Sequence, residues 1–132
     1  MDISNPPDFS AGMPPSLSVS NTDPLGEQIQ RAFSQARVVK TLNTMTARLQ
    51  VNLAALAGGE HHAFASGNDR QAIAQVVDLL KTSYGWRHVI DLGDITTARG
   101  AEMIMPIWLE LMGALKTPLF SFKVVGLGDD ES

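Results

Sequence analysis

The chain has 132 residues, of which 44% are hydrophobic and 18% are charged, as expected for one soluble α/β domain. Its net charge of −4 and the lack of a Lys/Arg cluster argue against a nucleic-acid partner. Because cysteine is absent, disulfides and thiolate metal sites are excluded and a cytoplasmic location is favoured. The most apolar run, residues 103–109, contains a proline and is too short to cross a bilayer, so we expect no membrane attachment.

The first twenty residues hold four prolines together with serine and glycine, which predicts an irregular loop. A helix follows, capped by Thr22 or Asp23 and running to about residue 35. Its apolar stripe consists of Leu25, Ile29, Ala32 and Phe33. Residues 37–42 come next, and two adjacent valines in this run indicate a strand covered on both faces.

Residues 45–57 predict a short helix and a turn that Gly58 and Gly59 terminate. Residues 61–66 form a second short strand. Asp69 then caps the clearest helix of the chain, which Gly85 ends. The apolar positions of this helix recur every three or four residues and are Ala72, Ile73, Val76, Val77 and Leu80.

The third strand covers residues 86–92, and residues 96–115 read as one long helix. Apolar residues surround this helix almost completely, and Met103, Met105 and Leu109 point away from the face expected on the sheet, which suggests a second partner surface. Residues 120–125 predict a final strand, and residues 126–132 a disordered acidic tail.

Strands alternating with helices predict βαβ units, and therefore an incomplete Rossmann-type α/β fold with a mainly parallel sheet of three or four strands flanked by helices. Ligands of such sheets bind at the carboxyl ends of the strands. The three strand ends are residues 43–45, 67–69 and 93–95.

A phosphate-binding glycine loop is absent from the sequence. Gly58-Gly59 follows an apolar run, and Gly126-Leu127-Gly128 lies in an acidic tail without a third glycine. In a G-x-G-x-x-G loop, the glycines let backbone N–H groups approach a pyrophosphate closely. We therefore do not expect the chain alone to bind a dinucleotide.

Four segments occur in a recognisable order and spacing: residues 2–6 (DISNP), 38–44 (VVKTLNT), 66–69 (SGND) and 91–99 (DLGDITTAR). They resemble the later part of the deazaflavin-dependent NADP oxidoreductase family, over residues 2 to about 125. The resemblance implies that residues 1–125 are the C-terminal part of an NADP-binding reductase domain. In the family a Rossmann half with the glycine loop precedes this region, so we expect a truncated or split gene product, or an internal start.

The resemblance also implies which residues bind ligands. The cofactor side would be bordered by Asn5, Pro6, Asn43, Thr44 and Met45, although deazaflavin reductases often carry histidine in place of Asn43. The substrate side would be formed by Gly93, Asp94, Ile95 and Arg99. NADP is the implied cofactor, with a deazaflavin as a possible acceptor, and hydride transfer between them requires placement of two rings rather than a tuned acid or base.

Several of these residues have a simpler structural interpretation. Asn43 either orients a ring carboxamide or satisfies local backbone groups. For Arg99, an ion pair with Glu102 is favoured over anion binding. We expect no metal site at His61 and His62, because adjacent strand residues face opposite sides of a sheet. Asp91 and Asp94 are more simply explained as a turn residue and a helix cap than as an acid/base pair.

Two functional hypotheses remain. The first is a reductase portion, active in a full-length context and inactive or nearly so alone, whose exposed first strand associates with a second copy or with a separately encoded N-terminal half. The second is a non-enzymatic interaction or dimerisation module that has lost cofactor binding.

Overall fold

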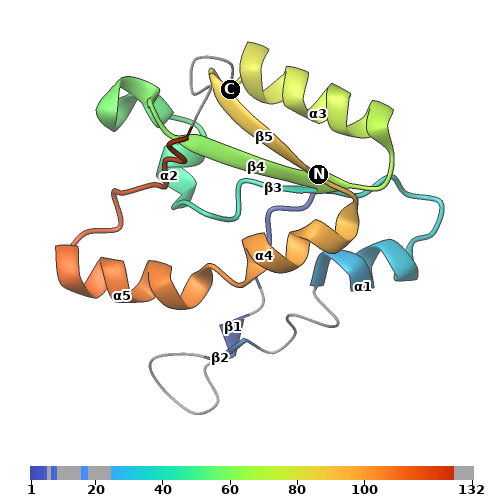
Figure 1. The fold of residues 1–132 in the computed structure, drawn as a ribbon, viewed down its shortest axis with the longest axis horizontal. Helices are drawn as coiled ribbons and strands as arrows, with labels where there is room; N and C mark the ends of the chain where they lie inside the picture. Colours follow the sequence, from blue (N-terminus) through green and yellow to red (C-terminus); the bar gives the residue numbers. More distant parts are fainter. Residues whose placement is uncertain (6, 9–15, 18–24, 127–132) are drawn as a thin grey trace.

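The computed structural model describes residues 1–5, 7–8, 16–17 and 25–126. Most of the expected N-terminal loop, Pro6, the cap positions Thr22 and Asp23, and the tail after residue 126 lie outside the described residues. Within them, the chain has an α/β fold built on a three-stranded sheet (Figure 1). The predicted fold class, an α/β sheet flanked by helices, is confirmed.

The strands of this sheet lie side by side in the order β3 (Val39–Thr41), β4 (His62–Gly67) and β5 (His88–Gly93). A separate antiparallel pair joins β1 (Pro7–Asp8) to β2 (Ser16–Leu17). The helices are α1 (Leu25–Ala32), α2 (Ala47–Gln50), α3 (Arg70–Thr82), α4 (Ala98–Glu102) and α5 (Met105–Leu115). Short 3-10 turns form η1 (Leu53–Ala55), η2 (Ala57–Gly59) and η3 (Ile95–Thr97).

The sheet is mixed. β4 and β5 are parallel and are connected by α3, which is the predicted βαβ unit. β3 instead runs antiparallel to β4, with Lys40 opposite Ser66. The predicted parallel crossover between these two strands is wrong, because their connection forms only α2 and short turns that bury Leu49 and Leu53 beside the start of β4. The carboxyl end of β3 therefore lies at the opposite end of the sheet from the carboxyl ends of β4 and β5.

The outer edge of β3 is occupied by the N-terminal segment. The Asp2 N–H donates to Val39 O at 2.8 Å, and the Thr41 N–H donates to Asp2 O at 2.9 Å, forming a parallel bridge between Asp2 and Lys40. The expectation that this side of the first strand is unpaired is wrong, since a segment 38 residues away along the chain supplies the partner.

Both faces of β3 are buried, as its paired valines predict. Val39 packs with Ala65 and Ile73 against α3, whereas Val38 packs with Ile95 and Ala98 on the other face. In Figure 1, α3 lies above the sheet and α1, α4 and α5 lie below it. A further core cluster surrounds Trp86, which is 1% exposed. The apolar stripe predicted for the first helix includes Phe33, but Phe33 is 64% exposed and is not part of the core.

The predicted long helix over residues 96–115 is divided. η3 and α4 form its first part and α5 its second, with the break at Met103 and Ile104. Pro106 lies in the first turn of α5, where its missing N–H is tolerated; in one continuous helix it would leave the carbonyl of Glu102 without its donor and bring the proline ring against that carbonyl. The expectation of one continuous helix is therefore wrong.

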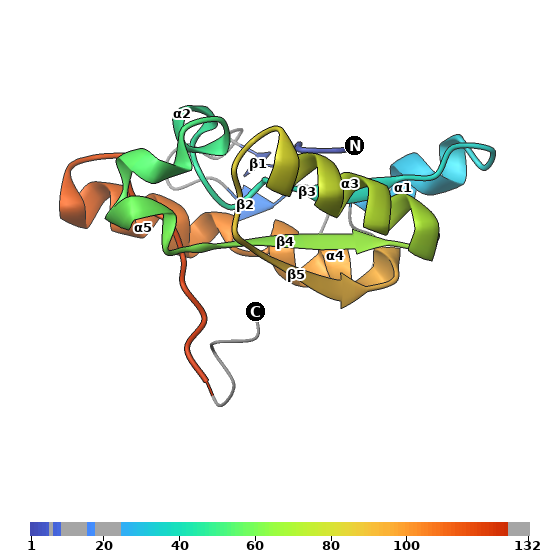
Figure 2. The same cartoon turned by 90° about the horizontal axis from the view of Figure 1, so that it is seen from above.

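The segment after α5 is extended, but it is not the predicted strand at residues 120–125. It is held by one histidine of β4: the His62 N–H donates to Phe122 O at 2.9 Å, and the Val124 N–H donates to His62 Nδ1 at 3.1 Å. Figure 2 shows this segment passing the start of β4 and then leaving the sheet. Its Phe120 ring contacts Trp108 of α5, with the centroids 5.1 Å apart.

Candidate functional site

Two asparagines from distant parts of the chain form a reciprocal amide pair at the carboxyl end of β3. Asn5 Nδ2 donates to Asn43 O at 2.8 Å, and Asn43 Nδ2 donates to Asn5 Oδ1 at 3.0 Å. Asn43 Nδ2 also donates to Ala101 O of α4 at 2.8 Å. Asn43 is 5% exposed, and its Oδ1 has no hydrogen-bond partner among the described residues. An acceptor is thus buried without a donor, an arrangement that usually has a functional or structural cause.

Two small cavities lie beside this pair. The first, here called the amide cavity, has a volume of about 100 Å³ and is lined by Asn5, Asn43, Met45, Thr46, Ile104, Met105 and Trp108. The second, the apolar cavity, has about 170 Å³ and is lined by Thr44, Phe64, Leu92, Gly100, Ala101 and Ile104. Ile104, at the break between α4 and α5, lines both.

Polar atoms without partners gather around these cavities. Besides Asn43 Oδ1, Thr44 Oγ1 and Trp108 Nε1 are buried and make no hydrogen bond within the described part of the chain. The two volumes fall below the ~300–1,000 Å³ typical of whole-ligand sites. Each cavity has room for one ring or a comparable group; the amide cavity offers two asparagine side chains beside its apolar walls, whereas Thr44 is the polar side chain of the apolar cavity.

A buried ionic cluster fixes the three segments that carry the amide pair. Lys40 Nζ lies 3.0 Å from Asp2 Oδ2 and 3.2 Å from Glu102 Oε1, and the Lys40 and Glu102 side chains are fully buried. Asp2 and Lys40 each lie three positions before one of the asparagines, and Glu102 follows Ala101. The cluster thus holds the N-terminal segment, β3 and α4 in one register.

The two carboxyl groups of this cluster respond to burial differently. Burial raises the pKa of Asp2, but hydrogen bonds from Ser4 and the charge of Lys40 outweigh it, and the net pKa is lowered. For Glu102 burial prevails over the opposing Lys40 charge and the Gly26 N–H, so its pKa is raised. Glu102 Oε1 accepts from Gly26 at 3.1 Å, whereas Oε2 has no partner among the described residues.

The predicted substrate-side residues lie at or after the carboxyl end of β5, at the end of the sheet opposite to the amide pair. Asp94 caps η3, and hydrogen bonds from Thr96 to its carboxylate lower its pKa. Ile95 is buried, and its N–H donates to Asn68 Oδ1 at 3.0 Å. Gly93 has φ +121°, a conformation that favours glycine. The antiparallel direction of β3 puts this loop and Asn43 at opposite ends of the sheet, and residues 93–95 and Arg99 line neither cavity, although the flanking Leu92 and Gly100 line the apolar cavity with Thr44.

Arg99 also differs from its predicted surroundings. Its Nε donates to Glu27 Oε1 at 2.8 Å, and a second nitrogen donates to Glu27 Oε2 at 3.2 Å. The expected ion pair with Glu102 is wrong, because Glu102 points into the interior toward Lys40. The partner of Arg99 lies on α1, 72 positions away along the chain, which local spacing could not reveal.

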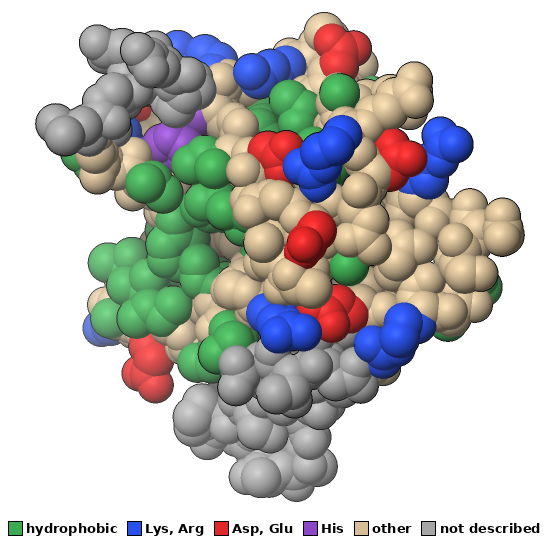
Figure 3. Space-filling model, turned by 45° about the vertical axis from the view of Figure 1, so that its right-hand side comes forward, with side chains coloured by type: hydrophobic (Ala, Val, Ile, Leu, Met, Phe, Trp, Pro, Cys, Tyr) green, Lys and Arg blue, Asp and Glu red, His purple; other side chains and the backbone are tan. Residues whose placement is uncertain are grey.

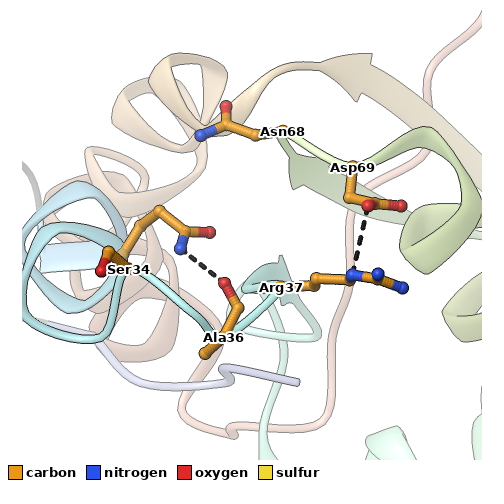
Figure 4. Close-up of a pocket in the computed structure, with 6 residues that line it drawn as sticks. Ser34, Ala36, Arg37, Asn68 and Asp69 are labelled. Atoms are coloured by element: carbon orange, nitrogen blue, oxygen red, sulfur yellow. Dashed lines mark hydrogen bonds and ion pairs between the residues drawn. The ribbon is translucent and has the colours of Figure 1, made fainter.

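A polar pocket of about 370 Å³ lies near the carboxyl end of β4, between the end of α1 and the start of α3 (Figure 4). Its lining residues are Gln30, Ser34, Ala36, Arg37, Asn68 and Asp69. Arg37 Nε lies 3.4 Å from Asp69 Oδ2, and Asp69 Oδ1 also accepts from the Ala72 N–H at 2.8 Å. The charged groups of this pocket are therefore paired with each other, and Asp69 serves as the predicted helix cap.

The site contains residues for which the sequence predicts mainly a structural role. Lys40 is predicted only to lie within a strand. Ile104 and Trp108 are predicted only to lie on a helix that packs against the sheet. Pro106 is the sequence feature that indicates this part of the site, because it marks the break between α4 and α5. The break places Ile104 between the cavities. Pro6 lies outside the described residues.

The two adjacent histidines have separate structural roles. His61 Nε2 lies 3.0 Å from Leu53 O, and His62 Nδ1 accepts from the C-terminal segment. Across the described ranges, no three His, Asp or Glu side chains lie close enough together to hold a metal ion. In the same ranges, no helix has the length and apolar character needed to span a bilayer.

The fold is an α/β sheet flanked by helices, and comparison with solved structures matches it to a Rossmann-like reductase. The crystal structure of a proposed F420-dependent NADP reductase from Arthrobacter sp. FB24 matches 95% of this chain with 62% sequence identity and a TM-score of 0.92. A hypothetical protein from Sinorhizobium meliloti matches 74% of the chain, with 31% identity and a TM-score of 0.51. No family model and no curated protein matches the sequence.

The predicted resemblance is therefore confirmed: the chain is related to the deazaflavin (F420)-dependent NADP reductases. It spans 56% of the length of the Arthrobacter protein and 45% of that of the Sinorhizobium protein.

Proposed function

We propose that this chain supplies the ring-binding part of a reductase that transfers hydride between NADPH and a deazaflavin such as F420. The observation that carries the proposal is the amide pair, with an unpartnered acceptor on Asn43 beside two ring-sized cavities. The 62% identity to a protein described as an F420-dependent NADP reductase supports the choice of cofactors. The cytoplasmic location predicted from the sequence is part of the same proposal.

The described residues fit one end of the dinucleotide better than the other. A nicotinamide or deazaflavin ring presents N–H groups that can donate to Asn43 Oδ1 and carbonyl groups that can accept from Thr44 Oγ1, and Ile104 and Trp108 supply apolar walls. No glycine loop for the diphosphate occurs in the sequence, and the Arg37 guanidinium of the polar pocket is paired with Asp69. A longer or second polypeptide would hold the phosphates.

The contribution of this chain to the reaction is placement. When bound, the two cofactors supply the hydride and its acceptor. The amide pair fixes the Asn43 side chain, since its nitrogen is committed to Asn5 and Ala101 and only its oxygen remains for a ligand. The buried Lys40 cluster prevents the three segments from shifting, and positioning of this kind supplies much of the rate enhancement in such transfers.

The test has two parts: calorimetric titration of the 132-residue chain with NADPH and with F420, and an activity assay for NADPH oxidation. Both are done with the chain alone and with added polypeptide corresponding to the unmatched part of the Arthrobacter protein. We expect the mixture to bind the cofactors and to oxidise NADPH in the presence of F420. The variant Asn43→Leu should abolish this oxidation, whereas the matched surface variant Gln75→Leu on α3 should not. Failure of the mixture to bind either cofactor, with both polypeptides folded, would refute the proposal and favour the non-enzymatic interaction module.

A further inference from the structure

The apolar cavity is open to solvent on one side and closed on the other. Leu92 is 38% exposed and Gly100 is also exposed, so these two residues lie at its mouth. Thr44 is 2% exposed and Ala101 8%, so they lie at its inner end. A small molecule can therefore enter past Leu92 and Gly100 and reach groups that are otherwise closed to solvent.

The inner end of the cavity carries a polar group without a partner. Thr44 Oγ1 is buried and makes no hydrogen bond to any residue that the structure describes. Burial of a hydroxyl without a hydrogen bond is unfavourable, and a ligand oxygen at this end would supply the missing partner. Since the other lining residues are apolar, the complementary ligand is an apolar group with one oxygen at its leading edge.

Gly100 is a glycine that the fold itself does not require. It lies inside α4 and its φ is not positive, and a Cβ at this position would meet no atom within 4 Å. Glycine in a helix interior is unfavourable relative to alanine. Because Gly100 lines the apolar cavity, a larger side chain there would narrow the mouth. Access for a ligand therefore explains the glycine.

Leu92 is placed at the mouth by a β-bulge. Ala65 pairs with Asp91 and Ser66 pairs with Gly93, so Leu92 is an extra residue of β5 without an opposite residue on β4. Bulges are frequent beside binding and active sites, where they redirect a side chain. The irregularity of β5 thus falls on a residue that lines the cavity, which is a second, independent indication of a site.

The size and charge of the cavity restrict the ligand further. Its volume is about 170 Å³, and a cavity of about 150 Å³ with aliphatic and aromatic walls accommodates benzene. None of the described residues that line it is charged, so a carboxylate or ammonium group would be buried without a partner. On the face that Figure 3 draws, acidic and basic side chains are interspersed, and this face offers no field of one sign to attract an ion.

We propose that the apolar cavity binds one uncharged six-membered ring whose leading oxygen, a hydroxyl or a ring carbonyl, forms a hydrogen bond with Thr44 Oγ1, and that Gly100 sets the size of this ring. The inference rests on the proposed function and deepens it, because it names the part of the hydride acceptor that enters this cavity.

The experiment titrates the 132-residue chain with phenol, toluene and benzoate and follows the methyl resonances of Leu92 and Ile104 by NMR. We expect phenol and toluene to shift these resonances with dissociation constants in the millimolar range, and benzoate to leave them unchanged at the same concentrations. Phenol that shifts neither resonance would overturn the proposal.

The hydroxyl is tested by Thr44→Val, which keeps the shape of the side chain. The ratio of phenol affinity to toluene affinity should fall about threefold to tenfold, as expected for the loss of one hydrogen bond. The melting temperature should not fall, because the lost hydroxyl has no partner among the described residues. Thr41→Val is the matched control: Thr41 Oγ1 is also buried without a described partner, but Thr41 lines neither cavity. An unchanged ratio in Thr44→Val would refute the assigned contact.

The mouth is tested by Gly100→Leu. Both ring compounds should bind at least tenfold more weakly, while the melting temperature should be no lower than that of the parent, since leucine is the better helix former and meets no atom at its Cβ. Gly113→Leu, on α5, is the control: its Cβ also meets no atom and it lines neither cavity, so binding should be retained. Parent-like binding by Gly100→Leu would contradict the role of Gly100.

The outcome is separable from that of the proposed function, because neither NADPH nor F420 takes part in these titrations. Ring binding that persists when the reductase mixture is inactive would support the cavity assignment and count against hydride transfer. An active mixture whose chain binds no phenol would do the reverse. In the mixture, displacement of phenol by F420 would assign the ring to the deazaflavin, and retention of phenol would assign it to a separate monocyclic compound; both results support the cavity assignment.

Discussion

Replacing Lys40 with methionine tests whether the buried ionic cluster holds the fold together. The substitution keeps the apolar stem but removes the charge between Asp2 and Glu102. Asp2 retains its hydrogen bonds from Ser4, so the loss falls on Glu102, which is fully buried and keeps only the Gly26 N–H. Removing one partner of a buried ion pair costs about 3–5 kcal/mol, and we expect about 3 kcal/mol at neutral pH.

The destabilisation by Lys40→Met should depend on pH in a defined direction. Burial raises the pKa of Glu102 above its ordinary value of 4.5, and loss of Lys40 raises it further. The folded protein therefore holds this proton to higher pH than the unfolded chain does. Stability from this group is complete below about pH 4.5 and is lost as pH rises through the folded-state pKa. The difference between variant and parent should thus be smallest in acid and grow toward neutrality.

Urea unfolding provides the assay, because Trp86 is 1% exposed and reports the core by fluorescence. In the control Lys40→Met/Glu102→Gln, a neutral amide replaces the isolated carboxylate, so the double variant should regain part of the loss and show a weaker pH dependence. A loss below about 1 kcal/mol at neutral pH, or an equal loss in acid, would refute the reasoning that Glu102 is left as an uncompensated buried charge.

Two further substitutions probe the ends of β4. Gly67→Ala should lower the free energy of unfolding by about 1–3 kcal/mol, because its Cβ would lie 2.8 Å from Val38 O; an unchanged urea midpoint would show that β3 can move away. His62→Ala removes the acceptor of the Val124 N–H and should speed tryptic cleavage after Lys123 several-fold, as followed by mass spectrometry, whereas equal rates would mean that the segment is held by other contacts.

The elements predicted with most success are those whose residues carry periodic information. The spacing of Ala72, Ile73 and Leu80 predicted α3, and all three are buried. Asp69 caps that helix as expected, through the Ala72 N–H. Local sequence determines such features, because a helix satisfies its hydrogen bonds within itself.

The direction of β3 could not be predicted from its residues. Apolar alternation is the same for a strand in either direction, and direction depends on how the connection folds. Here the connection buries Leu49 and Leu53 near the start of β4, which returns the chain antiparallel. As a result, the predicted cofactor-side residues Asn5, Asn43, Thr44 and Met45 line the cavities. The segment from Gly93 to Arg99 starts at the opposite end of the strands. Whether any of them binds a ligand stays a prediction.

Long-range polar partners were equally inaccessible to sequence reasoning. Asn5 and Asn43 were each identified through the family resemblance, but their reciprocal hydrogen bonds join segments 38 residues apart. From its neighbours in the sequence, Lys40 is predicted only to lie in a strand. A buried lysine has no local signature, because its burial depends on carboxylates supplied by the N-terminal segment and α4.

Because of the break between α4 and α5, the two cavities are walled by one deeply buried helix and one that lies at the surface. α4 is anchored by the buried Ala98, Ala101 and Glu102, whereas α5 buries no residue. Ile104 stands at the junction and lines both cavities. A rotation of α5 about this point would therefore alter the walls of both cavities without displacing the buried residues of α4. Differences in the outline of a bound ring would thus be taken up by Ile104 and α5 before they reach α4.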